Sequence, residues 1–369
     1  MNVIKDKCRG SLVGGAVGDA LGYEVEFMSL HAIRKRFGDS GISDYVVDSS
    51  GVAEFSDDTQ MSLFTAEGLL TGVADGQTNE MDILPYITKA YEYWYYTQSR
   101  PMEGMSGSWL TRIPSLWSRR APGNTCMSAL HAITKAETSM LVNNSKGCGG
   151  VMRVAPIGIF SAAHPDILDL EHAGYLAGYA AEVTHRHPLS TYSSMALAMI
   201  VGECITQDGI DREKFRIIVM DRIFGRLGQH LKDDEYLAGL QALIEKALTL
   251  AVSDRAATDA IRVLGEGWVA EETLAIAIFS VMRYIDDFEK CICCAVNHDG
   301  DSDSTGSVAG NIIGAILGYK AIPEKYLTHL ELHDVLLSVA DDLGGFSACE
   351  QMEQRYVDHR PFNVADGLS

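Results

Sequence analysis

The sequence lacks the features that would point to a membrane protein or a nucleic-acid-binding protein. No run of 18 or more apolar residues occurs among its 369 residues, so we expect no membrane span. Lysine and arginine total 30 against 50 aspartates and glutamates, which gives a net charge of −20. Because phosphate binding needs clustered basic side chains, this charge disfavours nucleic acid as a partner.

Signal-peptide and disulfide patterns are also missing. The first residues, MNVIKDKCRG, contain no apolar core, so we expect no signal peptide. The eight cysteines are scattered instead of standing at framework spacings, which predicts reduced thiols and a cytoplasmic location. Cys291 and Cys294 have CxxC spacing, but no second pair or suitable histidine follows to complete a zinc site. A buried helix face is the better interpretation of that segment.

Strand patterns are nearly absent, and SDYVVDSS (43–50) is the one β-like run of note. Helical periodicity recurs along most of the chain instead. No shift in composition marks a domain boundary, so we predict a single compact all-α domain over residues 1–369. The predicted helices cover residues 80–96, 126–141, 172–182, 190–205, 236–252, 271–285 and 331–342.

Two of the apolar segments carry glycine at every fourth position. The first ridge is Gly10, Gly14, Gly18 and Gly22, and the second is Gly306, Gly310, Gly314 and Gly318. Each glycine inside a helix lowers helix stability by about 1 kcal/mol relative to alanine. Close packing against another helix would offset this loss, because glycine lets two backbones approach. If the two helices are antiparallel neighbours, Glu24 and Glu26 approach the acidic stretch before the second ridge.

Acidic residues cluster at two predicted helix starts, in EFSDDTQMSLF and in NHDGDSDSTG. Helix capping explains part of this pattern, because serine, threonine and aspartate are preferred N-caps and Asp57 and Gln60 have the spacing of a capping box. One cap needs only one side chain, however. Capping therefore leaves the doubled Asp57 and Asp58 unexplained, and likewise the alternation of Asp299, Asp301 and Asp303.

Binding of a hard cation accounts for the remaining carboxylates. An EF-hand loop starting at Asp299 fails, because Ser304 stands where glycine is needed and Gly310 where glutamate is needed. Like charges about 4 Å apart repel by about 4 kcal/mol at an effective dielectric of 20, and divalent cations would offset that repulsion. Oxygen ligands favour Mg²⁺ or Mn²⁺ over zinc, and such ions can polarise a substrate oxygen or position a water.

The segment NNSKGCGGVMR combines glycines with hydrogen-bond donors. Glycine lets backbone N–H groups approach a phosphate or ribose closely, although a turn between helices would explain some of the glycines equally well. In THRHP, Pro188 indicates a helix start, and His185 read from the residues alone is more often structural than ligand-binding. Trp268 is expected in the core or in the wall of a cleft.

Six motifs in order resemble those of the ADP-ribosylglycohydrolases. They are Gly18-Asp19-Ala20-Leu21-Gly22 followed by Glu26, Ser56-Asp57-Asp58-Thr59, Gly147-Cys148-Gly149-Gly150-Val151-Met152-Arg153, Thr184-His185, GEGWVAEETLAIAIF, and Asp301-Ser302-Asp303-Ser304. Each motif is weak alone, but the ordered set is specific. The resemblance is strongest over residues 8–320.

The resemblance implies an all-α fold with a dinuclear cleft for two Mg²⁺ or Mn²⁺ ions. It implies hydrolysis of the glycosidic bond between ADP-ribose and an acceptor. The implied catalytic residues are Glu26, Asp58 and Asp303, with a gating or acid–base role for Glu26. The implied metal ligands are Ser56, Asp57, Asp58, Asp301, Asp303 and Ser304. The implied substrate-binding residues are Gly123, Gly147, Cys148, Gly149, Gly150, Val151, Met152 and His185.

The acceptor is less specified by the sequence than the reaction. RRAPGNTCMSAL and SDDT resemble the arginine-specific branch, so we expect an ADP-ribosylated protein, modified on arginine, and ADP-ribose as the partners. Serine-linked, O-acetyl and nucleic-acid-linked ADP-ribose are alternatives. So are a crystallin-like member without activity and a two-metal phosphoesterase. Nothing in the sequence indicates an oligomeric state.

Overall fold

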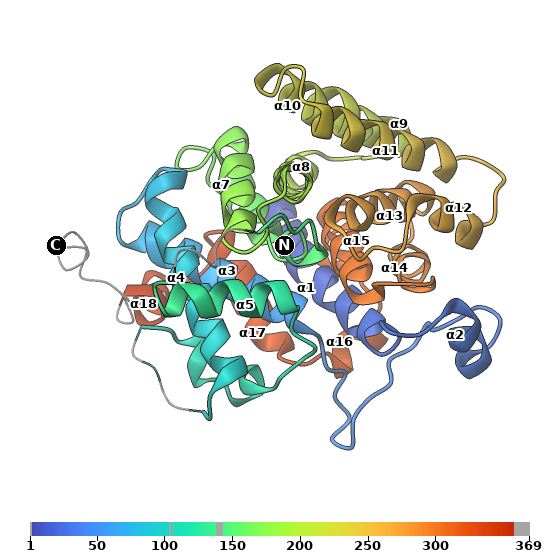
Figure 1. The fold of residues 1–369 in the computed structure, drawn as a ribbon. Helices are drawn as coiled ribbons and strands as arrows, with labels where there is room; N and C mark the ends of the chain where they lie inside the picture. The colour runs from blue at the N-terminus through green and yellow to red at the C-terminus, as the bar shows by residue number, and fades with distance from the viewer. Residues whose placement is uncertain (1, 103–104, 106, 138–142, 358–369) are drawn as a thin grey trace.

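The polypeptide folds into α-helices joined by short loops, which confirms the predicted fold class (Figure 1). The computed structural model describes residues 2–102, 105, 107–137 and 143–357. Within these ranges no β-strand forms, and the β-type pairing consists of two isolated bridges, Ala53 with Leu330 and Gly147 with Val269. The β-like run 43–50 is an irregular loop.

The helices run the length of the described chain. The α-helices are α1 (Val3–Tyr23), α2 (Leu30–Phe37), α3 (Asp57–Ala74), α4 (Glu80–Ser99), α5 (Asn124–Thr134), α6 (Ala155–Ala163), α7 (Leu170–Glu182), α8 (Pro188–Thr206), α9 (Arg212–Arg216), α10 (Gly225–His230), α11 (Glu235–Ala251), α12 (Ala257–Leu264), α13 (Ala270–Arg283), α14 (Phe288–Val296), α15 (Ser302–Leu317), α16 (Glu324–His329), α17 (His333–Leu343) and α18 (Cys349–Met352). Shorter 3₁₀ or π segments are η1 (Leu110–Arg112), η2 (Pro114–Trp117), η4 (Cys148–Gly150), η5 (Ile217–Phe224), η6 (Tyr319–Ala321) and η7 (Glu353–Val357).

One predicted helix is too long. The segment 126–141 was expected to be helical throughout, but α5 ends at Thr134. Ala136 then adopts a φ of 55°, in the left-handed region that residues with a side chain rarely enter inside a helix. Residues 138–141 of that prediction lie outside the described residues. The other six predicted segments match α4, α7, α8, α11, α13 and α17 to within two residues at most of their ends.

The two glycine ridges pack against each other, as the spacing predicts. Helices α1 and α15 lie antiparallel, so that Gly10 faces Gly314, Gly14 faces Gly310 and Gly18 faces Gly306. A Cβ atom added to Gly14 would lie 2.6 Å from the carbonyl oxygen of Gly310, so neither helix has room for a side chain there. The end of α1 is therefore held beside the start of α15.

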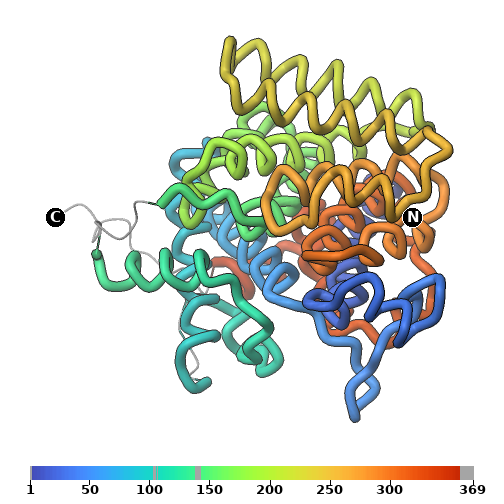
Figure 2. Tube along the Cα trace, turned by 45° about the vertical axis from the view of Figure 1, so that its right-hand side comes forward, coloured from blue at the N-terminus to red at the C-terminus, as the bar shows by residue number. Residues whose placement is uncertain are grey.

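The remaining helices enclose this pair. Helices α3, α8, α13, α14 and α17 pack around α1 and α15, and η5, α10 and α11 form an outer layer over α8 and α13 (Figures 1 and 2). Among the described helices, α8 is long and apolar enough to cross a membrane by length and composition. However, 72% of its apolar window is buried inside the molecule, where it packs on α6 and α7 as a core helix.

Candidate functional site

Three chain segments bring carboxylates to one place. Asp57 and Asp58 occupy the first turn of α3, Asp301 and Asp303 stand at the start of α15, and Glu26 follows the end of α1. All five residues are buried. One carboxylate oxygen from each of Glu26, Asp301 and Asp303 lies within 4.8 Å of the others. These five residues are called the acidic cluster below.

Asp19 attaches the start of α3 to α1. It is fully buried, and its carboxylate accepts hydrogen bonds of 2.9 Å from the backbone N–H groups of both Ser56 and Thr59. The hydroxyl of Thr59 also donates to it. The sequence reasoning included Asp19 only as part of a motif and assigned it no role. The available signal was a charged residue in the middle of an apolar, glycine-rich helix.

The α3 end of the acidic cluster is built by capping, but not in the predicted way. Ser56 is the N-cap and accepts a 3.2 Å hydrogen bond from the Asp58 N–H. The predicted capping box between Asp57 and Gln60 is wrong. The Gln60 side chain turns to other partners in the interior, and the Asp57 N–H donates to a backbone carbonyl at Arg120.

The start of α15 is also capped by a side chain. Asp301 is its N-cap and accepts a 3.3 Å hydrogen bond from the Ser304 N–H. Glu24 and Glu26 were both expected to lie near the start of α15, but only Glu26 lies beside Asp301 and Asp303. Glu24 points elsewhere and pairs with Arg36, so that part of the prediction is wrong. The carboxylate of Asp299 lies outside the acidic cluster. It accepts a 2.8 Å hydrogen bond from the N–H of Leu30 at the start of α2.

Electrostatics make the acidic cluster costly in the absence of a cation. Burial, followed by the charge of Asp303, raises the pKa values of Asp57, Asp58 and Asp301 well above the ordinary range and that of Glu26 to about 10. Four carboxylate oxygens in the acidic cluster are buried without a hydrogen-bond partner among the described residues. They are Glu26 Oε2, Asp58 Oδ2, Asp301 Oδ2 and Asp303 Oδ1.

Buried polar atoms nearly always have partners, so four unpartnered oxygens in one cluster fit the binding of a positively charged ligand. All ligand atoms offered are oxygens, which are the donors that Mg²⁺, Mn²⁺ and Ca²⁺ prefer. The residues present therefore fit a hard divalent cation. The same arrangement gives a soft metal such as zinc none of the nitrogen or sulfur ligands that it favours, apart from the neighbouring Cys148.

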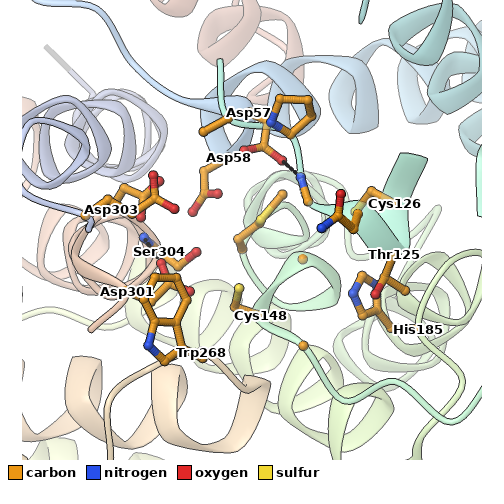
Figure 3. Close-up of a pocket in the computed structure, with 18 of the residues that line it drawn as sticks. Asp57, Asp58, Thr125, Cys126, Cys148, His185, Trp268, Asp301, Asp303 and Ser304 are labelled. Carbon is orange, nitrogen blue, oxygen red and sulfur yellow. Dashed lines mark hydrogen bonds between the residues drawn. The ribbon is translucent and has the colours of Figure 1, made fainter. Parts of the chain in front are cut away.

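A cleft of about 470 Å³ opens onto the acidic cluster. Figure 3 shows Asp58, Asp301, Asp303 and Ser304 on one side of it and Thr125, Cys126 and His185 on the other. The predicted substrate-binding residues Gly123, Gly147, Cys148, Gly149, Met152 and His185 line this cleft. Ser56, Gly150 and Val151 do not line it, and all three are buried behind the wall.

Several lining residues were not predicted: Phe27, Arg119, Ala121, Pro122, Asn124, Thr125 and Cys126. Most belong to RRAPGNTC, where Pro122 and Gly123 precede the start of α5. The signal for this segment was its turn-like composition just before a helix. The N–H of Gly123 donates a 3.3 Å hydrogen bond to Asp57, drawn dashed in Figure 3, and so connects this wall to the acidic cluster.

The glycine-rich segment lies against the loop that carries Trp268. The Cys148 N–H donates to the Trp268 carbonyl at 3.2 Å, and the Ala270 N–H donates to the Lys146 carbonyl at 2.8 Å. A Cβ on Gly149 would lie 2.8 Å from the His185 ring, so this glycine allows the imidazole to pack on the backbone. The segment is thus both a turn, η4, and one wall of the cleft.

An aromatic pair stands at the mouth of the cleft. The rings of Phe27 and Trp268 stack with centroids 5.9 Å apart and an interplanar angle of 19°. Phe27 is 75% exposed and Trp268 39% exposed, so both present ring surface to solvent beside the acidic cluster. Trp268 is therefore part of the cleft wall, which was one of its two expected positions.

Comparisons with known proteins identify the family of this chain. The sequence model of the ADP-ribosylglycohydrolase family matches residues 1–353. The ADP-ribosyl-[dinitrogen reductase] glycohydrolase of Rhodospirillum rubrum is 26% identical over 341 residues, covering 89% of this chain and 92% of that protein. An ADP-ribosylarginine hydrolase of Serratia proteamaculans is 25% identical over 344 residues, covering 92% and 79%. The ADP-ribosylhydrolase ARH3 of Gallus gallus is 23% identical over 371 residues, covering 91% and 92%.

The fold has a solved counterpart as well. A chain of an ADP-ribosylglycohydrolase-related protein complex superposes with a TM-score of 0.64 at 23% sequence identity, covering 94% of this chain and all of that one. The family match extends over nearly the whole sequence and includes every segment that lines the cleft. The chain belongs to the ADP-ribosylglycohydrolase family and is a hydrolase of ADP-ribose conjugates.

Proposed function

We propose that this protein hydrolyses the N-glycosidic bond between ADP-ribose and an arginine side chain of a modified protein, and so reverses mono-ADP-ribosylation. One observation carries the proposal. Unpartnered, buried carboxylate oxygens face the same cleft as a glycine-rich backbone wall and His185. An acidic pole beside a glycine-rich wall, where the backbone can approach a ligand closely, suits a ligand that contains both ribose hydroxyls and a pyrophosphate.

Two divalent cations, Mg²⁺ or Mn²⁺, are the proposed cofactors. The residues that would hold them are Ser56, Asp57, Asp58, Asp301, Asp303 and Ser304. When bound, such cations neutralise the carboxylates, polarise substrate oxygens and make a coordinated water more acidic. The orphaned oxygens of the acidic cluster support this assignment, because each lacks another positive or donor partner among the described residues.

The proposed catalytic residues are Glu26, Asp58 and Asp303. Each carries an unpartnered oxygen in the acidic cluster, in reach of a water or substrate in the cleft. Their negative charge would stabilise an oxocarbenium-like transition state, and one of them would accept the proton of the attacking water. The proposed substrate-binding segment comprises Gly123, Gly147, Cys148, Gly149, Gly150, Val151, Met152 and His185. Gly150 and Val151 do not line the cleft, so they would support its wall without touching the ligand.

Arginine linkage is supported by the mouth of the cleft. A guanidinium group is planar and cationic, so it can lie on the exposed faces of the Phe27–Trp268 pair while Glu26 lies nearby. A serine hydroxyl offers neither a plane nor a charge. The name of the relative from Serratia points the same way. Serine-linked, O-acetyl and nucleic-acid-linked ADP-ribose remain the alternative substrates.

The proposed setting is the cytoplasm, with an ADP-ribosylated protein and ADP-ribose as partners. All eight cysteines are unpaired, which suits a reducing compartment. We further propose that residues 1–369 act as one functional domain, because the cleft draws its residues from segments between α1 and α15.

One assay tests this function. The protein is incubated with arginine- and serine-ADP-ribosylated proteins, with and without a chelator, and the released nucleotide is identified. We expect free ADP-ribose from the arginine conjugate and loss of release after chelation. Release from the serine conjugate alone contradicts the arginine assignment, and AMP as product indicates phosphoesterase chemistry instead. No release, with no coupled calorimetric binding of Mg²⁺ and ADP-ribose, supports a structural role.

A further inference from the structure

Arg153, at the end of the glycine-rich segment, is a buried cation without a carboxylate partner. Its side chain is fully buried and forms no salt bridge within the described ranges. Its Nη2 donates to the carbonyl of Ala180 at 2.9 Å and to Thr184 Oγ1 at 2.7 Å, and its guanidinium lies 4.3 Å from the Tyr91 ring centroid. Burying a guanidinium without a carboxylate is costly, so its hydrogen bonds and the Tyr91 ring must offset that cost.

The contact with Thr184 continues to the cleft. Thr184 Oγ1 lies 2.8 Å from Nδ1 of the neighbouring His185, whose ring lines the cleft. Arg153, Thr184 and His185 therefore form one chain of hydrogen bonds that leads from the interior to the ligand side. All three residues are at least nine-tenths buried, so water does not compete for these bonds.

The direction of each bond follows from the chemistry of the donors. A guanidinium only donates, so Thr184 Oγ1 accepts from Arg153. The single hydroxyl hydrogen of Thr184 then has two strong acceptors in reach, His185 Nδ1 at 2.8 Å and the Ala181 carbonyl at 3.5 Å, whereas the neighbouring Cys126 sulfur is a weak acceptor. O–H donors prefer distances of about 2.5–3.0 Å, so the 2.8 Å contact favours Nδ1 over the carbonyl at 3.5 Å as the acceptor. An accepting Nδ1 carries no hydrogen.

The surroundings of His185 also favour the neutral imidazole. Burial, followed by the positive charge of Arg153, lowers the pKa of His185 to about 3. In a neutral imidazole whose Nδ1 accepts, the proton is on Nε2. Nε2 lies 3.2 Å from where a Cβ would stand on either Gly147 or Gly149, so side chains at these two positions would obstruct it.

We propose that Arg153 is a positioning residue that acts through Thr184 to hold His185 as the Nε2–H tautomer, a neutral donor directed along the glycine-rich wall. The ligand group it takes is an acceptor oxygen, such as a pyrophosphate or ribose oxygen. Only the identity of that ligand as ADP-ribose rests on the proposed function. The tautomer is a property of the protein alone.

The tautomer is measured in the full-length protein labelled with ¹⁵N-histidine. The His185 signals are assigned by their loss in His185→Asn. We expect the shift of a nitrogen without hydrogen for Nδ1, the shift of a protonated nitrogen for Nε2, and no titration between pH 5 and 8. A protonated Nδ1 in the wild-type protein overturns the proposal, because His185 would then donate to Thr184 and present a bare acceptor to the ligand.

Variants of Thr184 test the connection while keeping the shape of the side chain. Thr184→Val removes the hydroxyl, and we expect the Nδ1 signal to move, with a mixture of tautomers. ADP-ribose affinity measured by calorimetry with Mg²⁺ should fall roughly tenfold, as for loss of one hydrogen bond to a charged group. Thr184→Ser should restore both readings. An unchanged tautomer together with unchanged affinity in Thr184→Val overturns the proposal.

Arg153→Met provides a second test. We expect it to raise the pKa at which His185 titrates and to broaden the tautomer distribution, which a purely structural role would not produce. If Arg153→Met does not fold, the Thr184 variants still decide. Failure of the arginine assay with an Nε2–H tautomer would reject only the proposed function. Hydrolysis with an Nδ1–H tautomer would reject only the present inference.

Discussion

The carboxylate of Asp19, in the interior of α1, accepts a 2.9 Å hydrogen bond from the backbone N–H of Ser56, the N-cap of α3. This bond joins the start of α3, which carries Asp57 and Asp58, to α1, whose end leads to Glu26. Helix α1 packs tightly against α15 through the glycine ridges, and the hydrogen bonds of Asp19 hold the start of α3 against α1. The distance between the two acidic helix starts is thereby set by interior contacts and not by the carboxylates themselves.

Replacing Asp19 with alanine should destabilise the fold and disturb cation binding. The substitution leaves the N–H groups of Ser56 and Thr59 buried without an acceptor, at a cost of about 2–4 kcal/mol in the free energy of unfolding. Urea unfolding followed by circular dichroism measures it. Asp39→Ala, at an exposed position, serves as control and should change stability by less than about 0.5 kcal/mol. Equal effects of the two substitutions would show that Asp19 has no anchoring role.

A methyl group on the glycine ridge should be destabilising although alanine is the better helix former. In Gly14→Ala the new Cβ meets the Gly310 carbonyl oxygen at 2.6 Å, so the helices must separate, at a cost of about 1–3 kcal/mol. Gly239→Ala in α11 is the matched control. No atom lies within 4 Å of its added Cβ, so it should stabilise by about 0.5–1 kcal/mol. Thermal unfolding of both variants compares them, and stabilisation by Gly14→Ala would contradict close ridge packing.

The catalytic role of the acidic cluster can be tested with Asp299 as a control, because it belongs to the same stretch, NHDGDSDSTG, but lies outside the cluster. Asp58→Asn and Asp303→Asn should each lower kcat by at least about 100-fold, since each removes a charge that would hold a cation and stabilise the transition state. Asp299→Asn should retain near wild-type activity, because Asp299 faces the start of α2 and its amide oxygen can still accept from Leu30. Steady-state release of ADP-ribose measures all three. Wild-type turnover by Asp58→Asn would reject its catalytic assignment.

Divalent cations should stabilise the fold itself. A ligand that binds only the folded state adds about 2.7 kcal/mol at a concentration 100 times its Kd. Mg²⁺ or Mn²⁺ should therefore raise the Tm of the wild-type protein, and a chelator should reverse the increase. Asp303→Asn should lose most of this response, whereas Asp299→Asn should keep it. A Tm that does not change when either cation is added would contradict a cation site in the acidic cluster.

Glu67 predicts a pH dependence of stability away from the acidic cluster. It is fully buried in α3, accepts hydrogen bonds from Ser108 Oγ and the Leu110 N–H, and burial raises its pKa to about 7. Because the folded-state pKa lies above the unfolded value, its contribution is complete below about pH 4.5. That contribution is lost as the pH rises through 7, by about 3 kcal/mol when deprotonation is complete.

Glu67→Gln removes this titration while keeping a side chain of similar shape. Urea unfolding gives the free energy of unfolding of both proteins at pH 5.5 and at pH 8. The effect of Glu67 is the change, between these pH values, in the difference between the two proteins. We expect the stability of the wild-type protein relative to Glu67→Gln to decrease between the two pH values. A constant difference would show that Glu67 stays charged, or stays neutral, across the whole range.

Much of this fold follows from local patterns in the sequence. Helical periodicity located α4, α7, α8, α11, α13 and α17, because an amphipathic or apolar helix encodes its own spacing. The glycine ridges went further and predicted a long-range contact. A row of glycines is useful only where a second backbone comes close, so two such rows indicated each other as partners.

Other features depended on tertiary partners that no local pattern identifies. Glu24 and Glu26 are equivalent as residues, yet packing after α1 turns one toward Arg36 and the other into the cleft. Asp57 and Gln60 have the spacing of a capping box, but the carbonyl of Arg120 supplied a better partner. The length of α5 was likewise misjudged, since the turn at Ala136 stops it.

By itself the sequence determined most of the longer helices, the two acidic helix starts and the family, because these depend on residue type and spacing along the chain. Only the tertiary structure decided which carboxylates meet, that Asp19 joins α1 to α3, and that Arg153 reaches His185 through Thr184. The physical reason is that hydrogen bonds of buried charges are formed with whatever polar group the packed helices bring within about 3 Å. That proximity is a property of the assembled fold.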